Sequence, residues 1–236
     1  MLAVPYFSAA CQKSDRNLSC YAIPRDYHLF FKDLFDRLIP LLEERYPNHR
    51  FAGFADHSPI AEVDAAAKAG LGVIGMNRLL ITEPYSSFVF LGSLITDAKI
   101  PCEIHEVKRC EGCGLCRAAC PAKDGSECLS AITQKKGTLT DGEEAALLQG
   151  RSAWGCDLCQ TVCPHTKKAL REKTIHSPIP YFREETVSSL TLEALSKMTD
   201  TAFSNRAYSW RGRAVIQRNL TLLEAHIHKK QGDEPC

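Results

Sequence analysis

Eight cysteines between positions 110 and 163 have the spacing of iron-sulfur proteins. The first run, from Cys110 to Pro121, has the form C-x2-C-x2-C-x3-C-P, which binds [4Fe-4S] clusters in bacterial ferredoxins. In such a run three thiolates of a tight loop reach different irons of one cubane. The fourth cysteine, followed by a proline, serves a second cluster. The run therefore predicts one-electron transfer chemistry.

The second run, from Cys156 to Pro164, has the form C-x2-C-x3-C-P and lacks the first ligand of the pattern. Cys128 is the only cysteine between the two runs, so we expect it to supply the missing thiolate. The eight ligands then fill two cubanes. The predicted first set is Cys110, Cys113, Cys116 and Cys163, and the predicted second set is Cys120, Cys128, Cys156 and Cys159.

Two other interpretations of these cysteines explain fewer of them. An all-cysteine zinc site needs four thiolates and would leave four without a function. Disulfides need an oxidising compartment, and residues 1–10 lack the basic start of a signal peptide, while Pro5 interrupts their apolar run. We expect the remaining cysteines to be ordinary thiols: Cys11, Cys20, Cys102 and Cys236.

The composition is that of an ordinary globular protein. The chain has 236 residues, of which 44% are hydrophobic and 24% charged, with a formal net charge of +1. This length allows one large domain or two small ones. No apolar run is long enough to span a bilayer, so we expect a cytoplasmic protein without membrane contact.

Elements in the first hundred residues must position any further chemistry. Apolar residues at helical spacing predict an amphipathic helix over residues 26–46, kinked near Pro40. Residues 51–55 form a short strand candidate that ends at Asp56. Ser58 is a good N-cap with a proline after it, which predicts a helix from there to Gly70. Because Ser58 would cap that helix, Asp56 is left free for chemistry.

A glycine series follows at Gly70, Gly72 and Gly75. Such a series lets the backbone approach a large ligand closely. It comes after a helix, whereas a dinucleotide fingerprint follows a strand, so we do not expect NAD here. Further on, residues 79–82 and 88–96 are strand candidates, and residues 191–197 and 213–226 are helix candidates after a linker.

Several motifs in this order resemble the epoxyqueuosine reductase family, over roughly residues 3–220. They are Tyr21 to His28, Asp56 to Pro59, Ala69 to Asn77, Phe90 to Gly92 and Trp154 to Gln160. The resemblance implies an α+β fold: an α/β cobalamin-type reductase domain with an inserted or following bacterial ferredoxin-like domain for two [4Fe-4S] clusters, and a short helical C-terminus. We expect domain ranges of 1–104, 105–170 and 171–236. Relative to the family, the chain is expected to be shortened at both ends.

The resemblance also implies a reaction. Electrons would pass through the clusters to cobalamin, whose cobalt(I) state would attack the epoxide of a queuosine precursor in a tRNA anticodon and leave an alkene. Asp56 stands where the family has its proposed general acid, and a carboxyl group acts as an acid near neutral pH only if burial raises its pKa. Asp26 could equally cap the helix that starts at Tyr27. The implied cofactor or substrate contacts are Asp26, His28, Gly70, Gly72, Gly75 and Asn77.

The implied partners are an electron donor such as flavodoxin or ferredoxin, and tRNA. The segment from Lys167 to Lys173 and the C-terminal helices offer the basic surface that tRNA needs. We expect a monomer. Two other functions stay open: a ferredoxin-like electron-transfer protein without cobalamin chemistry, and a binding protein for tRNA or corrinoid in which the clusters are structural.

Overall fold

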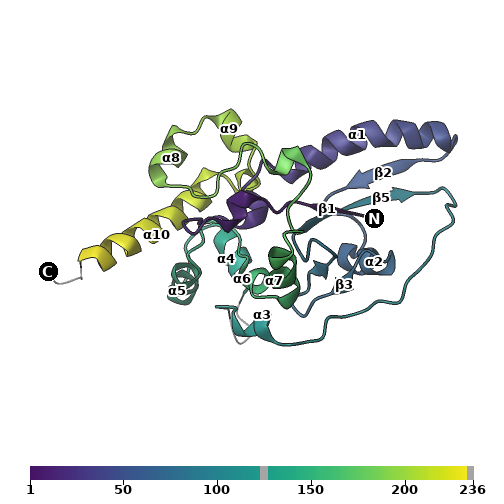
Figure 1. Ribbon diagram of the computed structural model, residues 1–236. Coiled ribbons are helices and arrows are strands. Elements are labelled where there is room, and N and C mark those ends of the chain that lie inside the picture. The colour runs from purple at the N-terminus through teal and green to yellow at the C-terminus, as the bar shows by residue number, and fades with distance from the viewer. Residues whose placement is uncertain (123–126, 233–236) are drawn as a thin grey trace.

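The computed structural model describes residues 1–122 and 127–232, with side chains up to residue 227. It is a mixed α+β structure (Figure 1). The strands are β1 (Leu2–Pro5), β2 (Phe51–Phe54), β3 (Val73–Ile74), β4 (Leu80–Ile81) and β5 (Val89–Thr96). The α-helices are α1 (Tyr27–Arg45), α2 (Glu62–Lys68), α3 (Leu115–Ala118), α4 (Leu129–Gln134), α5 (Asp141–Gly150), α6 (Leu158–Thr161), α7 (Pro164–Arg171), α8 (Leu192–Lys197), α9 (Asp200–Ser204) and α10 (Arg213–Gly232). Short 3-10 helices are η1 (Ala9–Gln12), η2 (Cys20–Ala22), η3 (Pro180–Phe182) and η4 (Ser209–Arg211).

Three strands form an antiparallel sheet in the order β1-β5-β2. Successive residues of β5 face opposite sides of the sheet. Gly92 faces Phe31 of α1, whereas Leu91 packs with the buried alanines of α2. The sheet therefore lies between α1 and α2, and β3 and β4 form a separate two-stranded ladder beside α2.

Helix α1 is positioned by its cap and by two glycines of the sheet. The Asp26 carboxylate accepts a hydrogen bond from the His28 backbone N–H, so Asp26 is the N-cap. The rings of Phe31 and Phe35 are buried against Gly92 and Gly53, where an added Cβ would come within 2.3 Å of the ring carbons. Glycine is needed at both positions because it lets the helix approach the sheet closely.

The predicted start of α2 was wrong. Ser58 does not cap it: the helix begins at Glu62, after Ala61, and the Ser58 hydroxyl donates to the Ile60 carbonyl. Asp56 and His57 have left-handed backbone conformations, with φ of 59° and 49°, so the chain makes a turn before the helix starts. The predicted end is confirmed, because Gly70 has φ of 75° just after the last turn.

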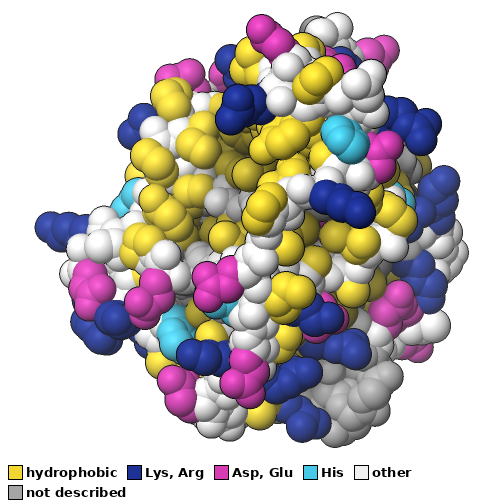
Figure 2. Space-filling model, turned by 90° about the vertical axis from the view of Figure 1, so that its right-hand side faces the viewer, with side chains coloured by type: hydrophobic (Ala, Val, Ile, Leu, Met, Phe, Trp, Pro, Cys, Tyr) yellow, Lys and Arg dark blue, Asp and Glu magenta, His cyan; other side chains and the backbone are white. Residues whose placement is uncertain are grey.

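One buried apolar cluster runs through the molecule. It includes residues from all three predicted domain ranges, such as Val4, Trp154 and Leu220. These ranges share a core, and their boundaries stay a prediction. None of the described helices is long and apolar enough to cross a membrane. On the face that bears the sheet, hydrophobic side chains surround a hollowed area, and charged side chains of both signs lie around it (Figure 2).

Candidate cluster and active site

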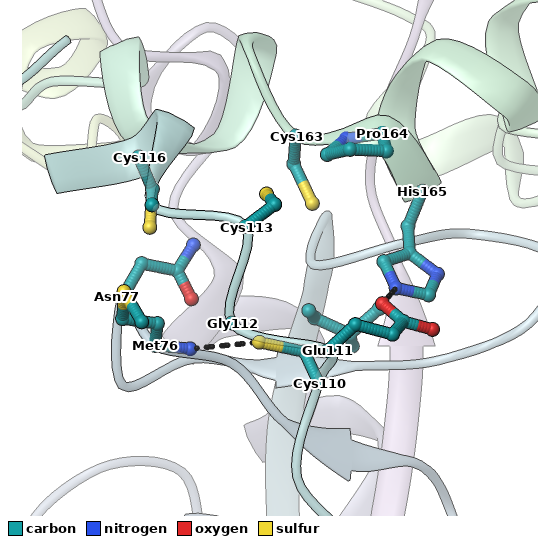
Figure 3. A pocket seen from close by; sticks show the side chains of 12 residues that line it. Met76, Asn77, Cys110, Glu111, Gly112, Cys113, Cys116, Cys163, Pro164 and His165 are labelled. Atoms are coloured by element: carbon teal, nitrogen blue, oxygen red, sulfur yellow. Dashed lines mark hydrogen bonds and ion pairs between the residues drawn. The ribbon is translucent and has the colours of Figure 1, made fainter. Parts of the chain in front are cut away.

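The four cysteines of the predicted first set line one pocket (Figure 3). Cys110 and Cys113 come from the loop that leads into α3, Cys116 comes from the first turn of α3, and Cys163 is the residue before α7. Gly112 and Gly114 have φ of 71° and 78°, which lets this loop turn tightly enough to present three sulfurs. The sulfurs thus face a common space from two segments.

The two residues that follow the glycine series contact this pocket. The backbone N–H of Met76 donates to Cys110 Sγ at 3.3 Å, and the side chains of Met76 and Asn77 line the pocket with the cysteines. Hydrogen bonds to cluster sulfurs are one means by which a protein tunes a reduction potential. Met76 and Asn77 therefore belong to the cluster surroundings.

In the predicted second set, Cys156 lies before α6 and Cys159 within it, and Cys120 and Cys128 lie near enough to Cys156 for their charges to affect its pKa. Burial raises the pKa of Cys156 to about 11, and the nearby charges of Asp157, Cys128 and Cys120 add to this. Burial likewise raises the pKa of Cys159 to about 12, with further contributions from Cys156 and Cys128. These thiols would be protonated at neutral pH without a metal, so binding iron must release their protons.

All cysteines in the described part of the chain are free thiols. Among the same residues, no group of three or more His, Cys, Asp or Glu side chains is placed to hold a single metal ion. The first set surrounds a pocket instead of a point, which suits a cubane because its irons each take a different thiolate. Cys11 and Cys20 are buried in the core and Cys102 is exposed, while Cys236 lies outside the described residues.

A second constellation joins the end of β2 to the start of α1. The Tyr27 hydroxyl donates to Asp56 Oδ2, and His28 Nε2 lies 3.5 Å from the same oxygen. His28 Nδ1 lies 2.8 Å from Asp26 Oδ1. His28 thus stands between two carboxylates, and Asp56 faces two donors.

The electrostatics of this constellation follow from those contacts. The hydrogen bond to Asp26, and then that to Asp56, raise the pKa of His28 to about 9. The pKa of Asp56 is lowered, first by the hydrogen bond from His28 and also by that from Tyr27, although burial opposes this. At neutral pH, His28 is therefore the protonated group and Asp56 is ionised. This differs from the burial-raised acid that the sequence argument required.

Glu62 is a nearby acid that the sequence argument did not single out. Burial raises its pKa, and the charge of Asp56 adds to the effect. Its Oε1 is buried and has no hydrogen-bond partner among the described residues. A carboxyl group in this position is more easily protonated than that of Asp56, which lies in the turn before α2.

A hollow of about 600 Å³ lies beside the first set and shares Cys110 with it. Its walls combine apolar side chains with two arginines and one acid. The lining residues are Val63, Asp64, Ile74, Gly75, Met76, Arg78, Arg109, Cys110 and Gly112. A ligand in this hollow would therefore lie against a cysteine of the first set.

No protein-family model matches the chain. The epoxyqueuosine reductase of Listeria monocytogenes is 32% identical over 216 residues, which cover 87% of this chain and 56% of that protein. The one from Bacillus cereus is 30% identical over 212 residues, or 86% of this chain and 55% of that protein. A crystal structure of an epoxyqueuosine reductase with a tRNA-Tyr epoxyqueuosine-modified tRNA stem loop matches with a TM-score of 0.79 and 27% identity, over 95% of this chain and 63% of that chain.

This chain is similar to epoxyqueuosine reductases over most of its length. The resemblance predicted from the motifs is thereby confirmed. The named relatives are oxidoreductases, and the chain spans little more than half of the length of the curated ones.

The structure divides the predicted cofactor contacts among three places. Asp26 and His28 meet Asp56, Gly75 lines the hollow, and Asn77 lines the cluster pocket. Gly70 and Gly72 pack against the chain itself: a Cβ on Gly72 would lie 2.2 Å from the Ile81 carbonyl oxygen, and one on Gly70 would meet His105. These two glycines need no ligand to explain them.

Proposed function

We propose that this chain is an iron-sulfur oxidoreductase of the epoxyqueuosine reductase type. It passes electrons through two [4Fe-4S] clusters to cobalamin, for reductive removal of the epoxide oxygen of a queuosine precursor in tRNA. The observation that carries the proposal is the pocket lined by Cys110, Cys113, Cys116 and Cys163, next to a hollow that shares Cys110. A ferredoxin-like electron-transfer protein would have no use for this hollow or for the group around Asp56.

The cysteine sets would hold the clusters, and the clusters supply electrons one at a time. The first set presents its sulfurs to a common pocket from two segments, which fits a cubane. The Met76 N–H and the tight glycine turns keep these sulfurs in place. A small electron carrier such as flavodoxin or ferredoxin would be the donor.

The hollow would hold cobalamin, which supplies a nucleophilic metal centre when it is bound and reduced. Val63, Ile74 and Met76 give the hollow an apolar wall. Arg78 and Arg109 place positive charge at its edge, where they could bind phosphate groups of a cofactor or of tRNA. The combination of apolar walls with a few polar groups is typical of cofactor sites.

Asp56 would deliver the proton to the leaving oxygen, with His28 as its proton source. A proton held at His28 Nε2 faces Asp56 Oδ2, while Asp26 holds the opposite ring nitrogen and fixes the orientation of the imidazole. Tyr27 donates to the same Asp56 oxygen and orients the carboxylate. His28 can therefore return a proton to Asp56, although the pKa of Asp56 is low.

The test starts with anaerobically prepared protein. Iron, sulfide and corrinoid contents are measured after incubation with cobalamin, followed by turnover of an epoxyqueuosine-containing tRNA stem loop. Asp64→Trp should fill the hollow from the exposed face of α2 and lower cobalamin retention at least tenfold, with full cluster content. Lys68→Trp, exposed on the same helix outside the hollow, is the matched control.

The outcomes separate the candidate functions. Clusters with cobalamin retention and turnover support the proposal. Clusters without any corrinoid uptake would favour an electron-transfer protein. Zinc without inorganic sulfide would reject both.

A further inference from the structure

Asp157 is a buried carboxylate placed between two cysteines of the second set. Its side chain is 1% exposed, and it stands directly after Cys156 and two residues before Cys159. It lies just ahead of α6 and does not cap that helix with its side chain. Its burial therefore needs an explanation other than local helix formation.

Four donors surround this carboxylate. Arg16 Nη1 lies 2.7 Å from Oδ2, and the Cys20 backbone N–H donates to the same oxygen at 2.8 Å. The Ser19 hydroxyl donates to Oδ1 at 2.5 Å, and Gln160 Nε2 donates to it at 3.2 Å. Three of the four donors come from residues 16–20, far away in the sequence.

The same two segments are joined along their backbones. The Ser19 N–H donates to the Trp154 carbonyl at 2.8 Å, and the Ala153 N–H donates to the Asn17 carbonyl at 2.7 Å. Gln160 extends the contact, because its Oε1 accepts from the Ser87 hydroxyl at 3.0 Å. The segment that carries Cys156 and Cys159, which includes the start of α6, is thus held against the N-terminal segment through the carboxylate of Asp157.

A buried charge beside a cluster also changes its energetics. Water screens exposed charges strongly but screens buried ones much less. Reduction adds an electron to a cluster, so a neighbouring negative charge disfavours the reduced state and a positive charge favours it. Net charge and hydrogen bonds around the sulfurs are among the factors that set the potential.

We propose that Asp157 is a positioning residue for the second set, and that its charge, partly balanced by Arg16, lowers the reduction potential of the cluster held there. This inference rests on the proposed function, because it requires that the second set binds a [4Fe-4S] cluster. The cysteine pattern does not predict this role, in which an ion pair outside the ligand set changes the reduction potential of one of the two clusters.

The experiment measures both midpoint potentials of the full chain by redox titration followed by electron paramagnetic resonance. Cys113→Ala removes a ligand of the first set and so identifies the signal of each cluster. Asp157→Asn should move the second potential to more positive values by the equivalent of a tenfold change in the reduction equilibrium, about 59 mV for one electron. Arg16→Gln should move it in the opposite direction, and the double variant should return close to the wild type.

Asp15→Asn is the matched control, because it removes the same charge from an exposed position one residue away from Arg16. It should leave both potentials unchanged. Opposite shifts for Asp157→Asn and Arg16→Gln support the inference, since lost structure alone would not give opposite signs. If Asp157→Asn does not fold, the negative shift of Arg16→Gln alone decides.

Unchanged potentials in protein that carries both clusters would overturn the inference and leave the proposed function intact. Shifts of equal sign in both variants would overturn it as well. Wild-type protein without iron and sulfide would instead reject the proposed function, and this inference with it.

Discussion

The protonation of His28 can be predicted with a magnitude. Its pKa is raised to about 9, chiefly by Asp26 and then by Asp56, from 6.5 for a free histidine. Without solvent screening, a pKa difference of about 2.5 would stabilise the folded state by about 3.4 kcal/mol. The imidazole is 47% exposed, so solvent screening reduces the contribution to stability to about 1 kcal/mol.

The pH dependence of this stabilisation follows from the direction in which the pKa of His28 is shifted. Because the folded pKa lies above the unfolded one, the stabilisation is present in full below pH 6.5 and is lost as the pH rises through about 9. His28→Gln should therefore lose about 1 kcal/mol relative to the wild type at pH 6 and almost nothing at pH 10. Urea unfolding at both pH values measures this difference.

The two carboxylates should contribute unequally. Asp26 Oδ1 lies 2.8 Å from the ring and Asp56 Oδ2 lies 3.5 Å from it, so Asp26→Asn should lower the pKa of His28 more than Asp56→Asn does. Asparagine keeps the helix cap at position 26, which limits the change to the charge. Titration of isotope-labelled histidine by nuclear magnetic resonance reads the pKa directly. A wild-type value of 7 or lower, or a larger effect from Asp56→Asn, would refute this reasoning.

Three further predictions concern packing, hydrogen bonding and partner binding. In urea unfolding, Gly72→Ala should lower the free energy of unfolding by about 2 kcal/mol or more, because the added Cβ would lie 2.2 Å from a backbone oxygen. Gly142 lies in α5 with open space around it, so Gly142→Ala should raise the free energy of unfolding by about 0.5 kcal/mol in the same titration. Asn219→Leu should lower the free energy of unfolding by about 2–4 kcal/mol in thermal unfolding, because Asn219 Nδ2 donates to two buried carbonyls at 2.7 and 2.8 Å. Gln217 is exposed on the same helix, so Gln217→Leu should change this free energy by less than about 0.5 kcal/mol. Affinity for the tRNA stem loop should fall steeply with salt, and neutralising the exposed Lys167, Arg171 and Lys173 should reduce the log–log slope by about 3; a flat salt response would argue against tRNA binding.

The sequence predicted those features that are encoded locally. Cysteine spacing led to two sets: the structure places the first set around one pocket, and Cys120 and Cys128 of the second lie near enough to Cys156 to affect its pKa. The long amphipathic helix and its cap at Asp26 are confirmed, since periodicity and capping both act within a few residues. Whether these cysteines are the ligands stays a prediction.

Features that depend on contacts between distant segments could not be predicted. Ser58 has the side chain of a good cap, but the left-handed turn at Asp56 and His57 places the helix start further on. The meeting of Asp26, His28 and Asp56 depends on how α1 crosses the end of β2. A glycine series looks the same in a sequence whether it serves a ligand or a neighbouring strand, and Gly72 serves the strand.

The loop of residues 75–77 explains how the proposed parts can act together. Met76 lines both the cluster pocket and the hollow, and its N–H contacts Cys110, which also lines both. Asn77 lines the same cluster pocket and approaches Cys159 of the second set closely enough to lower the pKa of that thiol. One short loop therefore touches both cysteine sets and the hollow. In the proposed function, this loop would lie between the first cysteine set and a cofactor in the hollow, because Met76 and Cys110 line both places.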